Sequence, residues 1–364
     1  MFERSIEDNS LKPHELYDRT LRMIRPVSPA WIEKAYQRLD SLTKPRRSLG
    51  YLEELAARLV AVLQQAQPKI EGKRVLVFVG DHKVVAEGVS AYPSSVTTLM
   101  VKNFIDGGAA INVLARRAGA EVEVIDIGMA EDPGKLKGLL HLNVKRGADN
   151  IAHGPAMTAE EVVRAVLVGI ERANQAADSH INLMATGEMG IGNTTPATAL
   201  LSVLLDLPVS DLVGPGTGLD AGGIARKRQI VEQAMAVNRT RCTDPLATLA
   251  ALGGLEIAGI CGLCLGAAAR ARPVVVDGFI SSAGALVAMR LCPAVKDYLF
   301  FAHMSAEPGH RKFFEKERLR PIVSLDMRLG EGTGAAIAMQ IMEDALAIYN
   351  EMATFEQAGI APGA

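Results

Sequence analysis

The residues of this chain that are most able to do chemistry lie in a few glycine-rich segments, and the richest is 186–200, TGEMGIGNTTPATAL. It follows the apolar run 181–185 and leads into an alanine- and leucine-rich stretch that favours a helix. Glycines let the backbone turn tightly against a ligand, and Pro196 suits the first turn of a helix. The N–H groups at a helix start favour an anion such as phosphate. The segment therefore predicts a phosphate site, with an ordinary glycine-rich turn as the alternative.

Two carboxylates stand among such glycines. Glu188 lies inside the first segment, where a phosphate would repel it, so it is expected to face a cation or a group that loses a proton. Glu331 lies between Gly330 and Gly332 in GEGTG, shortly after the apolar run 322–325. Partial desolvation at the end of a strand would raise the pKa of this carboxyl group, which suits a general base.

Two further loops could complete an anion pocket. The segment 211–220, DLVGPGTGLD, offers backbone N–H groups at Gly216 and Thr217, and Lys227 follows on the next predicted helix. The segment 305–310 adds a hydroxyl group at Ser305 after another strand. A basic surface helix and an ordinary turn remain the alternatives for these two segments.

Several common catalytic motifs are missing from the sequence. It contains no GxxxxGK[ST], GxSxG or HExxH, which argues against a P-loop enzyme, a common serine hydrolase and a zincin. GEGTG is not GxGxxG, so the dinucleotide signal is weak. His82 follows the first strand and is expected to be a hydrogen-bonded structural histidine. Cys261 and Cys264 form a CxxC without a second pair, so we expect packed core thiols.

Composition excludes several partners. The 364 residues are 49% hydrophobic with a formal net charge of -2, which gives no bias toward nucleic acid or an anionic membrane. The first ten residues, MFERSIEDNS, lack an apolar region typical of a secretory signal, and the uncharged stretch 257–269 is too short to span a bilayer. Four cysteines without a disulfide pattern suit a reducing cytoplasm.

Strands and helices are expected to alternate from residue 73 onward. The expected strands are 74–79, 121–127, 181–185, 273–276, 298–302 and 322–325. The expected helices are 96–118, 159–178, 223–238, 246–271, 281–291 and 333–352. Residues 1–69 are predicted to be mostly helical, with one helix starting at Ser28-Pro29.

This alternation predicts an α/β fold, with a mainly parallel Rossmann-like sheet flanked by helices. Ligands bind outside the carboxyl ends of the strands in such sheets, and the unusual glycines and carboxylates follow those ends. We expect an α/β catalytic core over 31–334 and a small helical subdomain from the chain ends, 1–30 and 335–364.

The segments together resemble a known family. They are GDH (80–82), EGVSAYP (87–93), GGAAIN (107–112), TGEMGIGNTTPA (186–197), GPGTG (214–218), DGFISSAGAL (277–286), AHMSAEPGH (302–310) and LGEGTGAA (329–336). In this order across most of the chain, they resemble the nicotinate-nucleotide–dimethylbenzimidazole phosphoribosyltransferases of cobamide (vitamin B12) lower-ligand assembly.

The resemblance implies a reaction and roles for residues. Nicotinate mononucleotide and 5,6-dimethylbenzimidazole, or a related base, would give α-ribazole 5′-phosphate and nicotinate, with inversion at C1′ and without a cofactor or a metal. Glu331 would be the general base and Glu188 a second active-site carboxylate. The phosphate and ribose would be held by Gly190, Gly192, Asn193, Thr194, Gly216, Thr217, Lys227 and Ser305. The base would contact Ser90, Met189 and Leu329.

The resemblance also implies a homodimer, and two positions depart from the family's pattern. A glutamine is expected near Leu99, and a small residue in place of Lys83. The leucine leaves the preferred base open among benzimidazoles, purines and phenols. A catalytically idle nucleotide-binding subunit would lack a carboxylate, and a nicotinamide-dependent oxidoreductase would carry GxGxxG with an acidic residue about 20 positions on.

Overall fold

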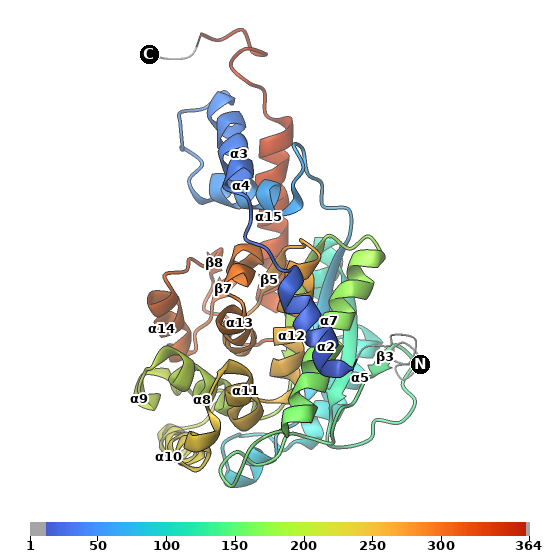
Figure 1. Ribbon diagram of the computed structural model, residues 1–364, viewed down its shortest axis with the longest axis vertical. Coiled ribbons are helices and arrows are strands. Elements are labelled where there is room, and N and C mark those ends of the chain that lie inside the picture. The colour runs from blue at the N-terminus through green and yellow to red at the C-terminus, as the bar shows by residue number, and fades with distance from the viewer. Residues whose placement is uncertain (1–11, 362–364) are drawn as a thin grey trace.

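A six-stranded sheet, parallel throughout, forms the centre of the protein in a computed structural model that describes residues 12–361 (Figure 1). The strand order is β3-β2-β1-β4-β5-β6. The strands are β1 (Lys73–Gly80), β2 (Glu121–Gly128), β3 (Leu139–His141), β4 (Leu183–Met189), β5 (Val274–Val276) and β6 (Leu299–Phe301). The predicted fold class is therefore confirmed.

Helices cover both faces of this sheet. The buried apolar side chains of β1 point alternately to the two faces, so both faces must be covered. Phe78 faces α12 (Leu255–Ala269), where Gly259 packs directly against its ring. Val75 and Val77 face the turn that opens α15 (Thr333–Glu351). α7 (Ala159–Asp178) lies outside α12, and small residues in both helices allow a close approach. The core is therefore layered, with the sheet buried in the middle.

Most of the predicted elements are found. The helix expected at 159–178 has these bounds, and Thr158 and Glu161 form its capping box. β4 extends four residues beyond the predicted 181–185, because residues 186–189 pair with β1. The first half of TGEMGIG is therefore strand, and Glu188 takes its direction from the sheet.

Glycines divide two helices that the periodicity predicted as continuous. Segment 96–118 forms α5 (Ser95–Asp106) and α6 (Ala110–Ala118), and α5 ends at Gly107 with φ 79°. Segment 246–271 forms α11 (Pro245–Leu252) and α12, divided at Gly253-Gly254. Both breaks place a helix start near the carboxyl ends of the strands.

The predicted strand 322–325 is not part of the main sheet. Residues Val323–Ser324 form β8, which pairs only with β7 (His303–Met304) in a separate two-stranded sheet. β3 and α14 (Pro308–Glu317) were not predicted. The remaining elements at this end of the molecule are η1 (Lys83–Glu87), α8 (Thr194–Leu205), α9 (Val209–Leu212), α10 (Ala221–Asn238), η2 (Arg239–Arg241) and α13 (Phe279–Leu291).

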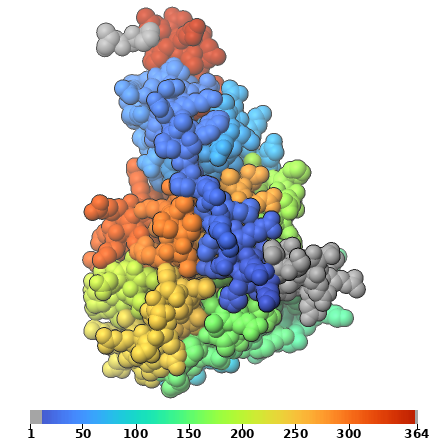
Figure 2. Space-filling view, in the orientation of Figure 1, coloured from blue at the N-terminus to red at the C-terminus, as the bar shows by residue number. Residues whose placement is uncertain are grey.

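A helical layer stands above the wider core, drawn in blue in Figure 2. α3 (Pro29–Ser41) packs on α4 (Tyr51–Leu63), and α4 packs on α15. α2 (Pro13–Met23) instead packs on α7 and α12. The division of the chain into a core, 31–334, and a subdomain from the two chain ends stays a prediction. Residues 1–11, where the sequence shows no secretory signal, lie outside the described residues.

Within residues 12–361, no helix combines the length and the apolar composition needed to cross a membrane. All four cysteines are free, and Cys261 and Cys264 are buried in α12 as predicted.

Candidate active site

The glycine-rich segments meet at one cavity of about 610 Å³ beyond the carboxyl ends of the strands. It is lined by eleven of the thirteen predicted site residues: Glu188, Met189, Gly190, Gly192, Asn193, Thr194, Gly216, Thr217, Ser305, Leu329 and Glu331. The other two, Ser90 and Lys227, each bond a residue of the lining. The cavity is therefore the candidate active site.

The turn between β4 and α8 forms one wall. Gly190 lies against β1, where an added Cβ would stand 2.1 Å from the carbonyl oxygen of Gly80. Gly192 has φ 86°, which a side chain would strain. The Ile191 N–H donates to Thr97 Oγ1, which donates in turn to Asp81. The turn is thus fixed from behind, and the start of α8 faces the cavity.

The loop at Gly216 packs directly on this turn. A Cβ at Gly216 would stand 2.8 Å from Thr194 Oγ1 and 3.1 Å from Lys227 Nζ, so only glycine fits. Lys227 Nζ donates to Thr194 Oγ1 at 2.6 Å and to the Gly214 carbonyl at 3.3 Å. Burial lowers the pKa of Lys227 to about 8, although attraction to Glu307 acts to raise it. Lys227 therefore lies one layer behind the cavity surface and holds the two loops together.

Glu331 occupies an unusual backbone conformation. Its φ is 65°, between Gly330 at 84° and Gly332 at 92°. A non-glycine residue with positive φ is strained, and such strain persists only where the surroundings hold it. The side chain is 4% exposed, and Oε2 accepts from the Ile111 N–H in the first turn of α6 at 3.3 Å. Burial raises the pKa of Glu331, while this N–H and the α6 terminus favour the carboxylate.

Asp277, at the carboxyl end of β5, fixes the turn that carries Glu331. One carboxylate oxygen accepts from the Gly332 N–H at 3.2 Å and the other from the Ala335 N–H at 2.9 Å. The first turn of α15 is thereby capped by a side chain from another strand. Desolvation raises the pKa of Asp277, and its charge raises the pKa of Glu331.

Glu188 has a different environment. Its carboxylate accepts a hydrogen bond from the side-chain amide of Asn193, and it is 6% exposed. Burial and the negative charges of Asp277, Glu256 and Glu331 raise the pKa of Glu188 to about 8, although the hydrogen bond from Asn193 acts to lower it. Glu188 is therefore mainly protonated at pH 7, whereas Glu331 has a helix terminus that stabilises its charge. Paired carboxyl groups whose environments differ in this way can take different roles.

The lining also includes residues that were not predicted as individual sites, among them Glu307, Arg328, His303 and Phe279. Glu307 accepts from the Gly216 N–H at 3.0 Å, and burial raises its pKa. Arg328 donates to the Gly216 carbonyl at 3.4 Å. His303, 2% exposed, lies 3.9 Å from Asp277. Phe279 adds an aromatic wall. Three of them lie inside quoted motifs, but a motif does not tell which of its side chains face a cavity.

The predicted base wall lies near α5. Ser90 is within hydrogen-bond distance of Thr217 at 3.2 Å, and Tyr92 lines the cavity. Val96 and Met100, one turn apart on α5, line it too, whereas Leu99 is 66% exposed and outside it. The departure at Leu99 therefore does not change the cavity lining.

His82 is the structural histidine that was predicted. Its Nε2 lies 2.7 Å from Glu256 Oε1, and both side chains are buried behind the β4–α8 turn. Burial acts to lower the pKa of His82, but attraction to Glu256 and Asp81 raises it above the usual value.

Comparison with known proteins gives a consistent result. A family model described as "Phosphoribosyltransferase" matches residues 24–360. A nicotinate-nucleotide–dimethylbenzimidazole phosphoribosyltransferase of Pelodictyon phaeoclathratiforme is 54% identical over 93% of this chain and 96% of its own length. One of that name from Chlorobium chlorochromatii is 53% identical over 95% and 98%.

A solved structure shares the fold. The crystal structure of CobT from Thermus thermophilus has a TM-score of 0.88 and 47% identity, over 92% of this chain and 100% of that one. The match spans nearly all of both chains and includes every segment that forms the cavity. This chain belongs to the phosphoribosyltransferase family that these proteins represent.

Proposed function

We propose that this protein transfers the 5-phosphoribosyl group from nicotinate mononucleotide to 5,6-dimethylbenzimidazole or a related base. The products are α-ribazole 5′-phosphate and nicotinate. The observation that carries the proposal is that two carboxyl groups, Glu188 and Glu331, share one cavity with the helix start after Gly192. Family membership agrees with the same reaction.

The phosphate and ribose are assigned to the β4–α8 turn and the Gly216 loop. The start of α8 borders the cavity, and Asn193, Thr194 and Ser305 line it. Lys227 supports the phosphate through Thr194. A bound dianion would favour the protonated lysine, against the burial that lowers its pKa.

The bond changes balance without a cofactor. The benzimidazole nitrogen attacks C1′ as the bond from C1′ to the pyridinium nitrogen breaks, and nicotinate leaves with the bonding pair. Departure neutralises the pyridinium, so the leaving group is already activated. The attacking ring gains positive charge, which is relieved when its other ring N–H gives a proton to Glu331. General-base help of this kind is worth roughly 10²–10⁴-fold, and positioning of both rings adds more.

The incoming base is assigned to the apolar side of the cavity. Met189, Leu329 and Tyr92 line it there, with Val96 and Met100 from α5. Ser90 is connected to this side by the hydrogen bond between its hydroxyl group and that of Thr217. Flat apolar walls favour an aromatic ring. Glu188, neutral at pH 7, is suited to donate a hydrogen bond to substrate and leaves proton removal to Glu331.

A homodimer in the cytoplasm completes the proposal. Tyr92 and Leu329, which line the cavity, have exposed apolar side chains, and so has Leu99 on α5, the helix that lines the cavity with Val96 and Met100. Exposed apolar side chains beside the cavity support its coverage by a second copy of the chain. Four free cysteines support a reducing compartment.

The direct test is to incubate the purified protein with nicotinate mononucleotide and dimethylbenzimidazole, and to follow free nicotinate and α-ribazole phosphate by chromatography. Both products should appear in equal amounts. Nicotinate without the ribazole product would indicate hydrolysis, and neither product would indicate an idle nucleotide-binding subunit.

A further inference from the structure

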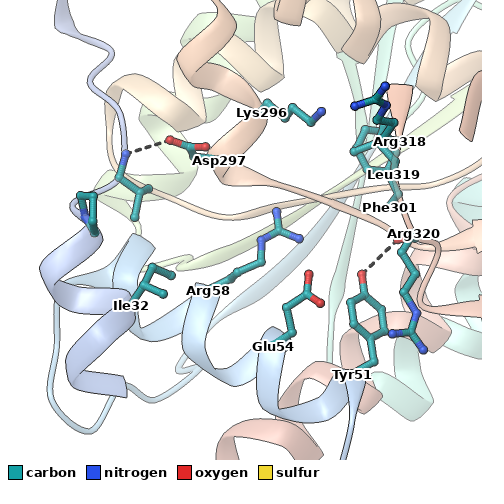
Figure 3. Close-up of a pocket in the computed structure, with 12 residues that line it drawn as sticks. Ile32, Tyr51, Glu54, Arg58, Lys296, Asp297, Phe301, Arg318, Leu319 and Arg320 are labelled. Carbon is teal, nitrogen blue, oxygen red and sulfur yellow. Dashed lines mark hydrogen bonds between the residues drawn. The ribbon is translucent and has the colours of Figure 1, made fainter. Parts of the chain in front are cut away.

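A second cavity, of about 630 Å³, lies between the helical layer and the core (Figure 3). Among the described residues, it shares no lining residue with the catalytic cavity. Lys296 and Asp297, just before β6, and Phe301, its last residue, line this cavity, whereas His303 and Ser305 line the catalytic cavity after β6 ends. The two cavities are therefore separate sites that β6 and the residues after it connect.

Its walls come from four parts of the chain, 27–32, 51–58, 296–301 and 318–320. Tyr51, Glu54 and Arg58 project from α4, and Figure 3 shows Lys296 and Asp297 of η3 (Pro293–Tyr298) across from them. Residues 318–320, after α14, close one side. Apolar side chains line the rest: Val27, Pro29, Ile32, Phe301 and Leu319.

Three of the cationic side chains are held in place by the protein. Arg58 donates to the Leu299 carbonyl at 2.6 Å, and its guanidinium lies 4.3 Å from the centre of the Phe300 ring. Arg320 lies 4.2 Å over the Tyr51 ring. Lys296 Nζ donates to the Glu317 carbonyl at 3.0 Å. Ordered cations lose little further side-chain entropy when they bind a ligand.

The positive charge of this cavity is not balanced. The lining holds four cations, Arg58, Lys296, Arg318 and Arg320, against the carboxylates Glu54 and Asp297. Within residues 12–361, none of the four cations forms an ion pair at 4.0 Å or less.

Two details concern how these charges are compensated. One oxygen of Asp297 already accepts from the Val27 N–H at 2.9 Å. Burial lowers the pKa of Arg58, although Tyr51, Glu54 and Asp297 act to raise it. A desolvated cation without a direct ion pair is costly, and an anionic ligand would relieve that cost.

We propose that this cavity binds an organic anion. Its carboxylate or phosphate group lies among Arg58, Lys296 and Arg320, and its aromatic or apolar body packs on Ile32 and Phe301. Guanidinium groups suit both kinds of oxyanion because they donate in a planar fork. The size of the cavity is in the range that takes a small organic molecule, roughly 300–1,000 Å³.

Calorimetric titration of the full chain with phenyl phosphate, and separately with benzoate, tests this site. No nucleotide is added, because nicotinate mononucleotide is itself an aromatic anion that could enter this cavity. We expect at least one equivalent of either probe per chain, and variants that leave the lining of the catalytic cavity unchanged assign the probe to one cavity or the other. Affinity should fall at least about tenfold in Lys296→Met and in Arg320→Met, since each loses one charge-assisted contact.

Arg311→Met is the matched control, because Arg311 is an exposed arginine of α14 that does not line the cavity. It should bind both probes as the unsubstituted chain does. Inorganic phosphate should bind more weakly than phenyl phosphate, since it leaves the apolar wall uncovered.

Three results would overturn the proposal: no binding of either probe, unchanged affinity in both variants, or equal affinity for inorganic phosphate. A fourth would be a change in the solution mass of both variants with probe affinity unchanged, which would assign the cavity to a second copy of the chain.

Discussion

Glu188 and Glu331 line one cavity, but different groups surround their carboxyl oxygens. Glu188 has the Asn193 amide and three neighbouring acidic side chains, and its pKa rises to about 8. Glu331 has the Ile111 N–H at the start of α6. At the residue scale, this difference is why we propose Glu188 as the neutral hydrogen-bond donor and Glu331 as the base.

The raised pKa of Glu188 predicts a pH-dependent stability. The folded chain holds this proton up to about pH 8, whereas the unfolded chain releases it near 4.5. Stability therefore falls as pH rises between these values. Glu188→Gln keeps an oxygen that can accept from Asn193 but does not ionise. Its free energy of unfolding, relative to that of the unsubstituted chain, should therefore increase from pH 5 to pH 9, by about 3–5 kcal/mol. Urea unfolding at both pH values measures it, and a difference that shrinks with rising pH would contradict the assignment.

Asp277→Asn should lower kcat at least about tenfold, with little effect on KM for nicotinate mononucleotide. Asparagine can accept from only one of the two N–H groups that Asp277 holds, so the Glu331 turn loses its anchor while the phosphate turn keeps its contacts. Steady-state kinetics measure kcat and KM separately. Asp206→Asn is the control, because Asp206 is exposed at the end of α8. A rise in KM alone would rule out this positioning role.

At the scale of elements, the site depends on where a strand becomes a helix. The β4–α8 turn lies against β1, and the Gly330–Gly332 turn lies against β4. Each turn has backbone that a side chain would displace or strain. The parallel sheet thus determines where the β4–α8 turn and the Gly330–Gly332 turn meet.

Gly190→Ala should raise KM for nicotinate mononucleotide about tenfold or more and destabilise the fold by roughly 1–3 kcal/mol. Its Cβ would stand 2.1 Å from the Gly80 carbonyl oxygen, so the turn must move away from β1. Gly154→Ala is the control, with nothing within 4 Å and no positive φ. Equal effects of the two substitutions on KM would contradict this account of the turn.

The sequence predicted the elements wherever apolar periodicity was strong, as in β1, β2 and α7. It missed α14 because that helix is mostly polar, and its only large apolar residues are Phe313 and Phe314, which are both buried. It joined α5 to α6 because Gly107 and Gly108 carry no apolar signal. The glycine-rich site segments were found, since their composition is unusual. The contact of Ile111 with Glu331 was not, because it joins residues distant in sequence.

At the scale of the whole molecule, the exposed apolar residues near the cavity mouth stand out against a core that buries most large apolar side chains. Tyr92 and Leu329 line the cavity, and Leu99 lies on the outer side of α5. A monomer would leave this patch in water, which is unfavourable by about 25 cal/mol per Å². The patch is therefore where we expect the second copy to dock.

Sedimentation should give a mass of twice 38.8 kDa for the unsubstituted chain. Leu99→Glu places a charge in the proposed contact and should shift the protein toward a single chain. Val237→Glu changes an exposed apolar residue of α10 in the same way and should leave the mass unchanged. A Leu99→Glu protein with the same mass as the control would remove α5 from the contact.

The central claim is that Glu331 removes the proton from the incoming base, and turnover of Glu331→Gln tests it most directly. Glutamine can still accept from the Ile111 N–H, so the variant should fold and bind nicotinate mononucleotide normally. We predict that kcat for α-ribazole phosphate formation falls at least about a hundredfold. Near-normal turnover in a folded, substrate-binding variant would contradict the claim.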